Sequence, residues 1–259
     1  MKKDGDCMAD TRYIQIRQII FFYLLLCITV RYTIVRIQDN YFVCLFSFFT
    51  VLLCVFFVPS MKRELNYSEF LHTMMYYFSM YIWGGDCLFN ANNYGFRLCL
   101  PIRIFAIVGI VLIILLRKND YKNVLMGSIS KIPIQRKEFV NELTASGIAL
   151  VSEELYFTAF LIGRLHTKGI VCSVFTSAIL FALSHFLNRW ASKMFSLKDY
   201  LFILVLAIFK GIVFYYTRDI MLTIIIHFIY NSSEFIVLVK RLRLKNSGLN
   251  NVSMFDDYE

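Results

Sequence analysis

Three short polar patterns lie inside stretches that are otherwise apolar enough to sit in lipid. They are Glu153-Glu154 in SEELYFTAFL, His185 in FALSHF, and His227 with Asn231 in HFIYN. An ionisable group at membrane depth is costly, so it usually faces the interior of a helix bundle and serves a function there. Two carboxylates, two imidazoles and a carboxamide could together hydrolyse a peptide bond. The sequence therefore predicts a hydrolytic site.

The two adjacent glutamates are predicted to have different roles. In an α-helix, neighbouring side chains point about 100° apart, whereas residues i and i+4 share a face. Glu153 shares its face with Phe157, and Glu154 shares its face with Thr158. One carboxylate can therefore address an active centre while the other braces a neighbouring helix. The alternative interpretation is a pair of buried, protonated carboxyl groups at a helix contact.

The order of the polar patterns along the chain supports a functional interpretation of the two histidines. His227 and Asn231 lie one turn apart on one helix face, where they could bind a metal ion or donate two hydrogen bonds to an oxyanion. Taken alone, His185 would more often be a packing or interfacial residue. All three patterns occur in order in consecutive apolar segments, however, and this order favours one shared site.

The composition predicts an all-α, polytopic transmembrane bundle. Of the 259 residues, 58% are hydrophobic and only 17% are charged, whereas a soluble domain carries about 25% charged residues. The apolar runs are continuous rather than alternating, which argues against a β-barrel. Since a bilayer core requires about 20 residues per helix, we expect about eight spans, with the catalytic core in the C-terminal four. Their ranges are 13–31, 41–58, 68–84, 98–116, 140–163, 168–188, 199–216 and 219–239.

The distribution of charge predicts a topology. Most of the 27 lysines and arginines fall in the N-terminal tail and in the segments that follow the even-numbered spans. The positive-inside rule then places both termini in the cytoplasm. The net charge of +9 thus indicates orientation and attraction to anionic lipid. No folded basic domain is visible, so nucleic acid is not an expected partner. The compact size and the lack of a eukaryotic retention signal favour a bacterial cell membrane.

The ordered patterns resemble those of the intramembrane CAAX proteases and bacteriocin-processing enzymes, the CPBP or Abi family. That family shows E-E-x-x-x-R, then F-x-x-x-H, then H-x-x-x-N, and this chain has E-E-L-Y-F-T, F-A-L-S-H and H-F-I-Y-N. The run from Gly211 to Asn231 is also similar to the family's glycine-led helical hairpin. We expect three regions: N-terminal spans with a basic loop, a protease core and a polar tail, at 1–138, 139–240 and 241–259.

One position departs from the family pattern. Thr158 stands where the family usually has arginine, one turn after Glu154. An arginine there would suit an ion pair with Glu154, so this carboxylate lacks its usual partner unless Thr158, a water molecule or Arg164 replaces it. A buried carboxylate without a partner is costly, or it stays protonated. Lys210, inside the seventh span, is expected either to snorkel toward the interface or to face the bundle.

The resemblance implies an intramembrane endopeptidase. Glu153 would take a proton from water, His185 would orient that water or share the work, and His227 with Asn231 would hold the oxyanion. The substrate would be a peptide or a lipidated membrane protein. The alternative is a non-catalytic family scaffold that acts in bacteriocin self-immunity or as a membrane chaperone of a peptide sensor or transporter. A small-solute transporter is less favoured, because no inverted repeat is apparent.

No cofactor is favoured, although zinc is possible. Glu153, His185 and His227 would be a sufficient ligand set for catalytic zinc. The lack of an H-E-x-x-H motif and the presence of the Asn231 carboxamide favour the metal-free version. The seven cysteines include no C-x-x-C pair and lie mostly in apolar runs, so they support neither a zinc nor a redox motif.

Overall fold

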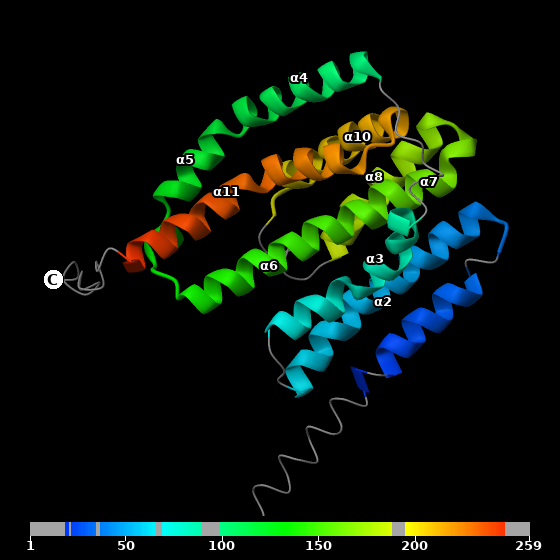
Figure 1. Ribbon diagram of the computed structural model, residues 1–259, viewed down its shortest axis with the longest axis horizontal. Helices are drawn as coiled ribbons and strands as arrows, with labels where there is room; N and C mark the ends of the chain where they lie inside the picture. The colour runs from blue at the N-terminus through cyan, green and yellow to red at the C-terminus, as the bar shows by residue number, and fades with distance from the viewer. Residues whose placement is uncertain are drawn as a thin grey trace, which may run out of the picture.

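The chain forms a bundle of helices in a computed structural model (Figure 1). The structure describes residues 19–20, 22–34, 37–65, 69–89, 99–187 and 195–246. Within these ranges all regular structure is helical and no strand occurs. The all-α fold class expected from the composition is therefore confirmed.

Within the described part of the first half of the chain lie four longer helices and two short ones. A helix at Phe22–Ile34 comes first. It is followed by α2 (Asn40–Leu65), α3 (Glu69–Phe89), α4 (Leu100–Leu116), α5 (Lys118–Met126) and the 3-10 helix η2 (Ser128–Lys131). These helices cover the first four predicted spans, except for the part of the first span before residue 19, which lies outside the described residues.

The second half begins with one long, composite helix. It consists of α6 (Arg136–Glu153), the π-helix η3 (Glu154–Leu161), α7 (Ile162–Leu165) and the 3-10 helix η4 (His166–Lys168). Among the described residues that follow are the helices α8 (Ile170–Leu187), α10 (Leu197–Thr217) and α11 (Ile220–Asn246). They coincide with the last three predicted spans, although α11 continues past the expected end at 239. The proposed division into three regions stays a prediction.

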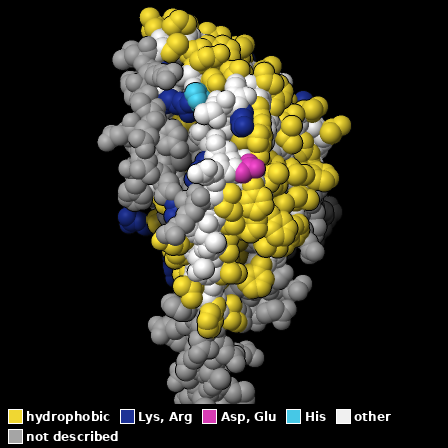
Figure 2. Space-filling model, turned by 90° about the vertical axis from the view of Figure 1, so that its right-hand side faces the viewer, with side chains coloured by type: hydrophobic (Ala, Val, Ile, Leu, Met, Phe, Trp, Pro, Cys, Tyr) yellow, Lys and Arg dark blue, Asp and Glu magenta, His cyan; other side chains and the backbone are white. Residues whose placement is uncertain are grey.

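The surface identifies a multi-pass membrane protein. Among the described residues, five helical segments are long and apolar enough to cross a membrane, namely Asn40–Val58, Arg136–Lys168, Ile170–Leu187, Leu197–Thr217 and Ile220–Asn246. The helices Phe22–Ile34 and Leu100–Leu116 are apolar but shorter. Figure 2 shows a face dominated by hydrophobic side chains. Such a surface is unfavourable in water but suits lipid, so the polytopic bundle is confirmed, with five long spans where eight were expected.

Local sequence signals explain where two of the central helices begin. The backbone N–H of Gln135 donates to the Glu138 carboxylate at 3.1 Å, and this capping interaction opens α6. Ser196 caps α10, because its backbone N–H donates to Asp199 Oδ2 at 2.7 Å and its hydroxyl accepts from the Asp199 N–H at 3.4 Å. Both caps satisfy amide groups that a helix N-terminus leaves without partners.

The hairpin of α10 and α11 turns without a glycine. Arg218 adopts a left-handed conformation with φ of 56°, which few non-glycine residues do. The next residue, Asp219, caps α11 by accepting from the Leu222 N–H at 3.1 Å. Asp219 also forms an ion pair with Arg103 of α4 at 3.1 Å. This contact holds α4 against the turn and fixes the position of the last two helices.

The π-helix η3 forms the centre of the bundle. All eight of its residues are buried. Figure 1 shows α2 and α3 on one side of the composite helix and α10 and α11 on the other. On the α2 and α3 side, Tyr156 shares a hydrogen bond of 2.9 Å with Ser47, and Trp83 packs on Phe160 with ring centroids 5.7 Å apart. This packing holds the two glutamates at the start of η3 in place.

A glycine allows α3 to approach η3 closely. A Cβ atom built on Gly84 would lie 2.6 Å from the backbone carbon of Leu155, whereas one built on Gly85 would meet nothing within 4 Å. Small residues at such crossings let helix backbones come close together in membranes. The crossing lies directly beside Glu153 and Glu154, so its geometry affects where both carboxylates point.

We predict that Gly84→Ala destabilises the protein and that Gly85→Ala does not. The first methyl group forces α3 away from Leu155, and overpacking of this kind costs about 1–3 kcal/mol. Thermal unfolding of the purified protein in detergent measures the difference. Equal unfolding midpoints for the two variants would contradict the close crossing of α3 and η3.

Candidate active site

Four of the five predicted site residues line one cavity. Its volume is about 390 Å³, and α3, α6, α8, α10 and α11 all contribute to its walls. Glu153, His185, His227 and Asn231 are part of the lining, whereas Glu154 is not. The structure thus brings together side chains from three helices that the sequence separates by up to 78 positions, from Glu153 to Asn231. A polar cavity of this kind inside a membrane protein is suited to binding and chemistry.

Glu153 is the carboxylate that faces the cavity. It is the last residue of α6, and its side chain keeps 12% of its surface exposed. Its Oε2 atom lies 3.9 Å from His227 Nε2. That distance is too long for a direct hydrogen bond but short enough for one water molecule to join the two groups. The position satisfies the first requirement for a general base, which is access to water.

Glu154 does not line the cavity and is fixed by three partners. Its side chain is 1% exposed and forms an ion pair with Lys210. The Thr158 hydroxyl donates to Oε2 at 2.8 Å, and Oε1 lies 2.8 Å from His227 Nδ1. Thr158, one of the three possible replacements for the missing arginine, therefore does contact Glu154. Because every one of these partners comes from the packed interior, Glu154 acts as a brace rather than as a group open to substrate.

Lys210 faces the interior of the bundle, which was one of its two expected positions, but the sequence did not identify its partners. It is 2% exposed, and its ammonium group contacts both Glu154 and His227, the latter at 3.2 Å from Nδ1. It therefore supplies the positive charge that the family's usual arginine would have brought, but from α10. A lysine alone in the apolar run AIFKGIVF was a signal of burial. The sequence did not show which carboxylate would contact Lys210. Arg164, which was another possible partner of Glu154, lies with its guanidinium carbon 5.8 Å from the centroid of the Phe160 ring.

His185 and His227 lie on two sides of Phe181. The ring centroid of Phe181 is 4.5 Å from that of His185 and 6.1 Å from that of His227. His185 Nδ1 is 3.0 Å from the Phe181 carbonyl oxygen. Since a carbonyl oxygen can only accept, Nδ1 carries the proton in this bond, and the Nε2 atom of a neutral His185 is left with a lone pair.

Other cavity residues come from outside the predicted motifs. Tyr77 of α3 faces the motifs across the cavity, and Glu234 lies one turn beyond Tyr230 on α11. Arg117, at the end of α4, donates to the Tyr230 carbonyl oxygen at 2.6 Å and lies 4.3 Å from the centroid of that residue's ring. The first half of the chain thus supplies part of the wall that a substrate would meet.

The described side chains do not form a ready metal site. No group of three His, Cys, Asp or Glu residues among them lies close enough to hold a metal ion. The possible zinc ligands Glu153, His185 and His227 share the cavity but do not converge on a single point. We therefore derive no chemical step through a metal ion.

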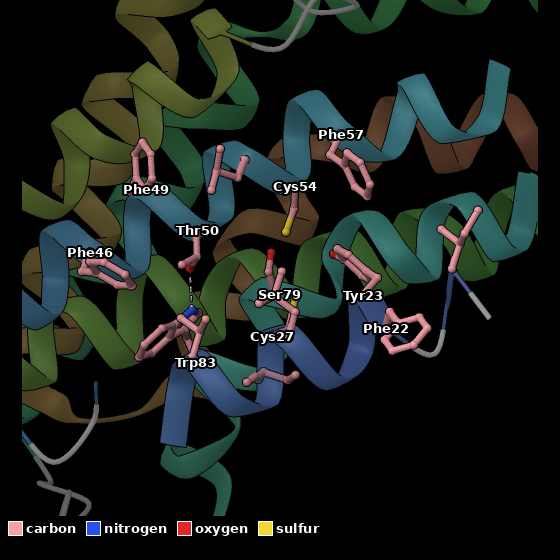
Figure 3. A pocket seen from close by; sticks show the side chains of 15 residues that line it. Phe22, Tyr23, Cys27, Phe46, Phe49, Thr50, Cys54, Phe57, Ser79 and Trp83 are labelled. Carbon is pink, nitrogen blue, oxygen red and sulfur yellow. Dashed lines mark hydrogen bonds between the residues drawn. The ribbon is translucent and has the colours of Figure 1, made fainter. Parts of the chain in front are cut away.

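A second cavity lies apart from these polar groups. It has a volume of about 540 Å³ and lies between the helix Phe22–Ile34, α2 and α3 (Figure 3). Its lining is mostly apolar, and Trp83 Nε1 donates to Thr50 Oγ1 there at 2.8 Å. Its described lining residues include no Asp, Glu, His, Lys or Arg, so it lacks the carboxylates and imidazoles that distinguish the first cavity.

The family comparison agrees with the position of the site. Residues 136–233 match the family described as Type II CAAX prenyl endopeptidase Rce1-like. The matched segment begins at the first residue of α6 and ends within α11, so it contains all five predicted site residues. The match confirms the resemblance to the CPBP family and supports a membrane protease at the level of the family. No curated protein and no solved structure matches the chain.

We predict that the Thr158 hydroxyl is needed to hold Glu154. Thr158→Val keeps the shape of the side chain but leaves Glu154 Oε2 without its donor, and a buried polar group left in this way costs about 1–3 kcal/mol or more when charged. Thr158→Ser, which keeps the hydroxyl, is the matched control. Unfolding midpoints in detergent should fall for the valine variant well below those of the serine variant, and the reverse order would contradict the assignment.

Proposed function

We propose that the protein is an intramembrane endopeptidase that cleaves a peptide or a membrane-associated protein by glutamate-activated water. The observation that carries this proposal is the difference between two adjacent carboxylates. Glu154 is buried and paired, whereas Glu153 faces a cavity next to His227 Nε2. An accessible carboxylate beside an imidazole suits general-base catalysis. The family match supports a protease at the coarse level.

The proposed reaction needs only groups of this chain and one water molecule. A proton passes from the water to Glu153 while the water oxygen bonds to the carbonyl carbon of the scissile amide. The negative charge moves to the carbonyl oxygen, where the Asn231 side-chain N–H donates a hydrogen bond. The C–N bond then breaks as Glu153 returns the proton to the leaving nitrogen. His185, on the neighbouring wall, helps to orient the water.

The family match and the location in a membrane support the proposed substrate class, which is a peptide or a lipidated protein. A peptide or lipidated protein would reach the cavity from the bilayer or its surface, and no cofactor is required in this scheme. Both termini lie on the cytoplasmic side in this proposal, since that orientation keeps most basic residues inside. A bacterial cell membrane remains the proposed location.

The scaffold alternative loses its main support in this geometry. Thr158 in place of arginine would favour a non-catalytic scaffold if it left Glu154 without a cation. Lys210 occupies that role from α10. The departure from the family pattern therefore does not by itself argue for a protein without catalytic activity in self-immunity or chaperoning.

We predict that Glu153→Gln abolishes cleavage while the protein still inserts and folds. The amide cannot accept the proton, and general-base catalysis contributes about 10²–10⁴ in rate. Glu142→Gln is the matched control, because Glu142 lies on the same helix and pairs with Arg241 at the surface. Cleavage is measured with purified protein in liposomes, using a quenched-fluorescence peptide that ends in a prenylated CAAX sequence.

A cellular assay separates the enzyme from the scaffold. A strain that lacks the gene is complemented with the variant Glu153→Gln/His185→Ala/His227→Ala. The protease proposal predicts no complementation at normal protein level. Full complementation by this triple variant would establish the scaffold reading instead.

We predict a partial loss for Asn231→Ala. Removing one oxyanion donor typically lowers the rate by about 10²–10³, so residual cleavage should remain measurable. Asn141→Ala, at an exposed position of α6, is the matched control. The same liposome assay gives both rates, and a variant at Asn231 with the control's rate would remove this residue from the mechanism.

A further inference from the structure

A third cavity lies on the outer side of the bundle. It has a volume of about 380 Å³ and forms a groove between α4 and α10, which we call the α4–α10 groove. Figure 1 shows α4 along the edge of the bundle. The exposed lining residues include Phe105, Val108, Leu112 and Val205. Because these apolar side chains face outward in a membrane protein, the groove is open to the hydrocarbon of the bilayer.

Polar contacts fix α4 at both ends of the groove. Arg103, near the start of α4, forms an ion pair with Asp219 at 3.1 Å. Arg117, directly after the end of α4, donates to the Tyr230 carbonyl oxygen at 2.6 Å. The position of α4, and with it the width of the groove, is therefore set by these two contacts.

Positive charge lies at one end of the groove. Phe105, early in α4, packs on Phe209 of α10 with ring centroids 5.2 Å apart, and the two helices run in opposite directions along the groove. Arg117 at the end of α4 therefore lines the same end as Phe202, near the start of α10. Lys198 Nζ lies 5.9 Å from the centroid of the Phe202 ring. Two cations from two helices thus meet at this end.

The lining of the groove adds no negative charge. Its described residues include no Asp or Glu. Asp199, next to Lys198, accepts from the backbone N–H and the hydroxyl of Ser196 at 2.7 and 2.6 Å, and it lines the first cavity instead. An anionic group at the charged end of the groove would therefore meet cations and no carboxylate of the lining.

The length of the groove matches one leaflet of a bilayer. From Phe105 to Arg117, α4 rises by about 18 Å, and half of a hydrocarbon core is about 15 Å thick. In the orientation proposed above, the charged end faces the cytoplasm, where anionic lipids attract basic residues. A guanidinium carries several N–H donors, so Arg117 can hold the Tyr230 carbonyl and a phosphate oxygen together.

We propose that the α4–α10 groove binds an anionic phospholipid, with its phosphate at Arg117 and Lys198 and one acyl chain along the groove. Positive charge at one end and an apolar length of one leaflet are complementary to such a head group and tail. A peptide segment would leave its backbone N–H and C=O groups without partners in this apolar lining. The site is separate from the proposed hydrolysis, so lipid binding can be measured without any substrate.

The groove shares a wall with the first cavity. Arg117, Leu206 and Tyr230 line both. Tyr230 is followed by Asn231, the proposed oxyanion donor, and the guanidinium carbon of Arg117 lies 4.3 Å from the centroid of the Tyr230 ring. A phosphate that holds Arg117 therefore also steadies the part of α11 that carries Asn231.

Native mass spectrometry of the full chain in detergent measures the binding. Delipidated protein is titrated with dioleoylphosphatidylglycerol and, separately, with dioleoylphosphatidylcholine, which has the same acyl chains but no net charge. A basic residue near a membrane surface contributes about fivefold to lipid affinity, so two should give a preference of at least about tenfold for phosphatidylglycerol. Equal affinity for the two lipids would overturn the proposal.

Charge variants test the position of the head group. Arg117→Gln/Lys198→Gln should lose the preference for phosphatidylglycerol. The matched control is Lys137→Gln/Arg243→Gln, which removes two exposed basic residues from the same side of the membrane in the proposed orientation and should keep the preference. Lys198→Gln alone leaves the contact between Arg117 and Tyr230 intact and should weaken binding about fivefold. A double variant that binds like its control would contradict the site.

A bulky side chain tests the position of the acyl chain. Leu112→Trp fills the groove, whereas Leu115→Trp, the matched control, changes an exposed residue of the same helix outside the lining. Phosphatidylglycerol with a photoreactive diazirine in its acyl chain should attach to α4 or α10 in the wild type and the control, and not in Leu112→Trp. Attachment only to other helices, or unchanged binding by Leu112→Trp, would show that the groove does not hold the chain and would refute the proposal.

Discussion

The rest of the structure depends on the ion pair between Glu154 and Lys210. Both side chains are almost fully buried, at 1% and 2% exposure. In a bundle that faces lipid, a charge without a partner at this depth is unfavourable, and breaking a buried pair costs about 3–5 kcal/mol in soluble proteins. The pair joins η3 to α10. Because Lys210 also lies 4.8 Å from the Phe181 ring centroid and close to His227, α8 and α11 meet at the same point.

The π-helix gives this pair its geometry. η3 begins at Glu154, directly after the last α-helical residue, Glu153. π-helical turns are rare, and they occur frequently at functional sites because they change the direction of the side chains that follow. Neighbouring side chains of a helix point about 100° apart, so Glu153 lines the cavity while Glu154, the first residue of η3, lies in the packed interior. The burial of the whole of η3 holds that separation.

Much of the fold could be predicted because it depends on local composition. Long apolar runs predicted the positions of the helices, and His227 and Asn231, which are spaced one turn apart, both line the cavity. The partner of Glu154 could not be found in this way, since Lys210 lies 56 positions away and only tertiary packing brings it near. The turn at Arg218 could not be predicted from a glycine, because the residue with positive φ is an arginine. No short motif predicts a π-helix either, so the sequence did not indicate that one begins at Glu154.

The position of α3 has a consequence for how related proteins can diverge. Thr73, Tyr76, Tyr77 and Met80 form a wall opposite the polar motifs, yet they lie outside the segment 136–233 that matches the family. The matched segment thus includes the polar motifs but not the α3 residues that help to shape the cavity around them. Two chains with the same motifs can therefore enclose differently shaped cavities when the residues at these α3 positions differ.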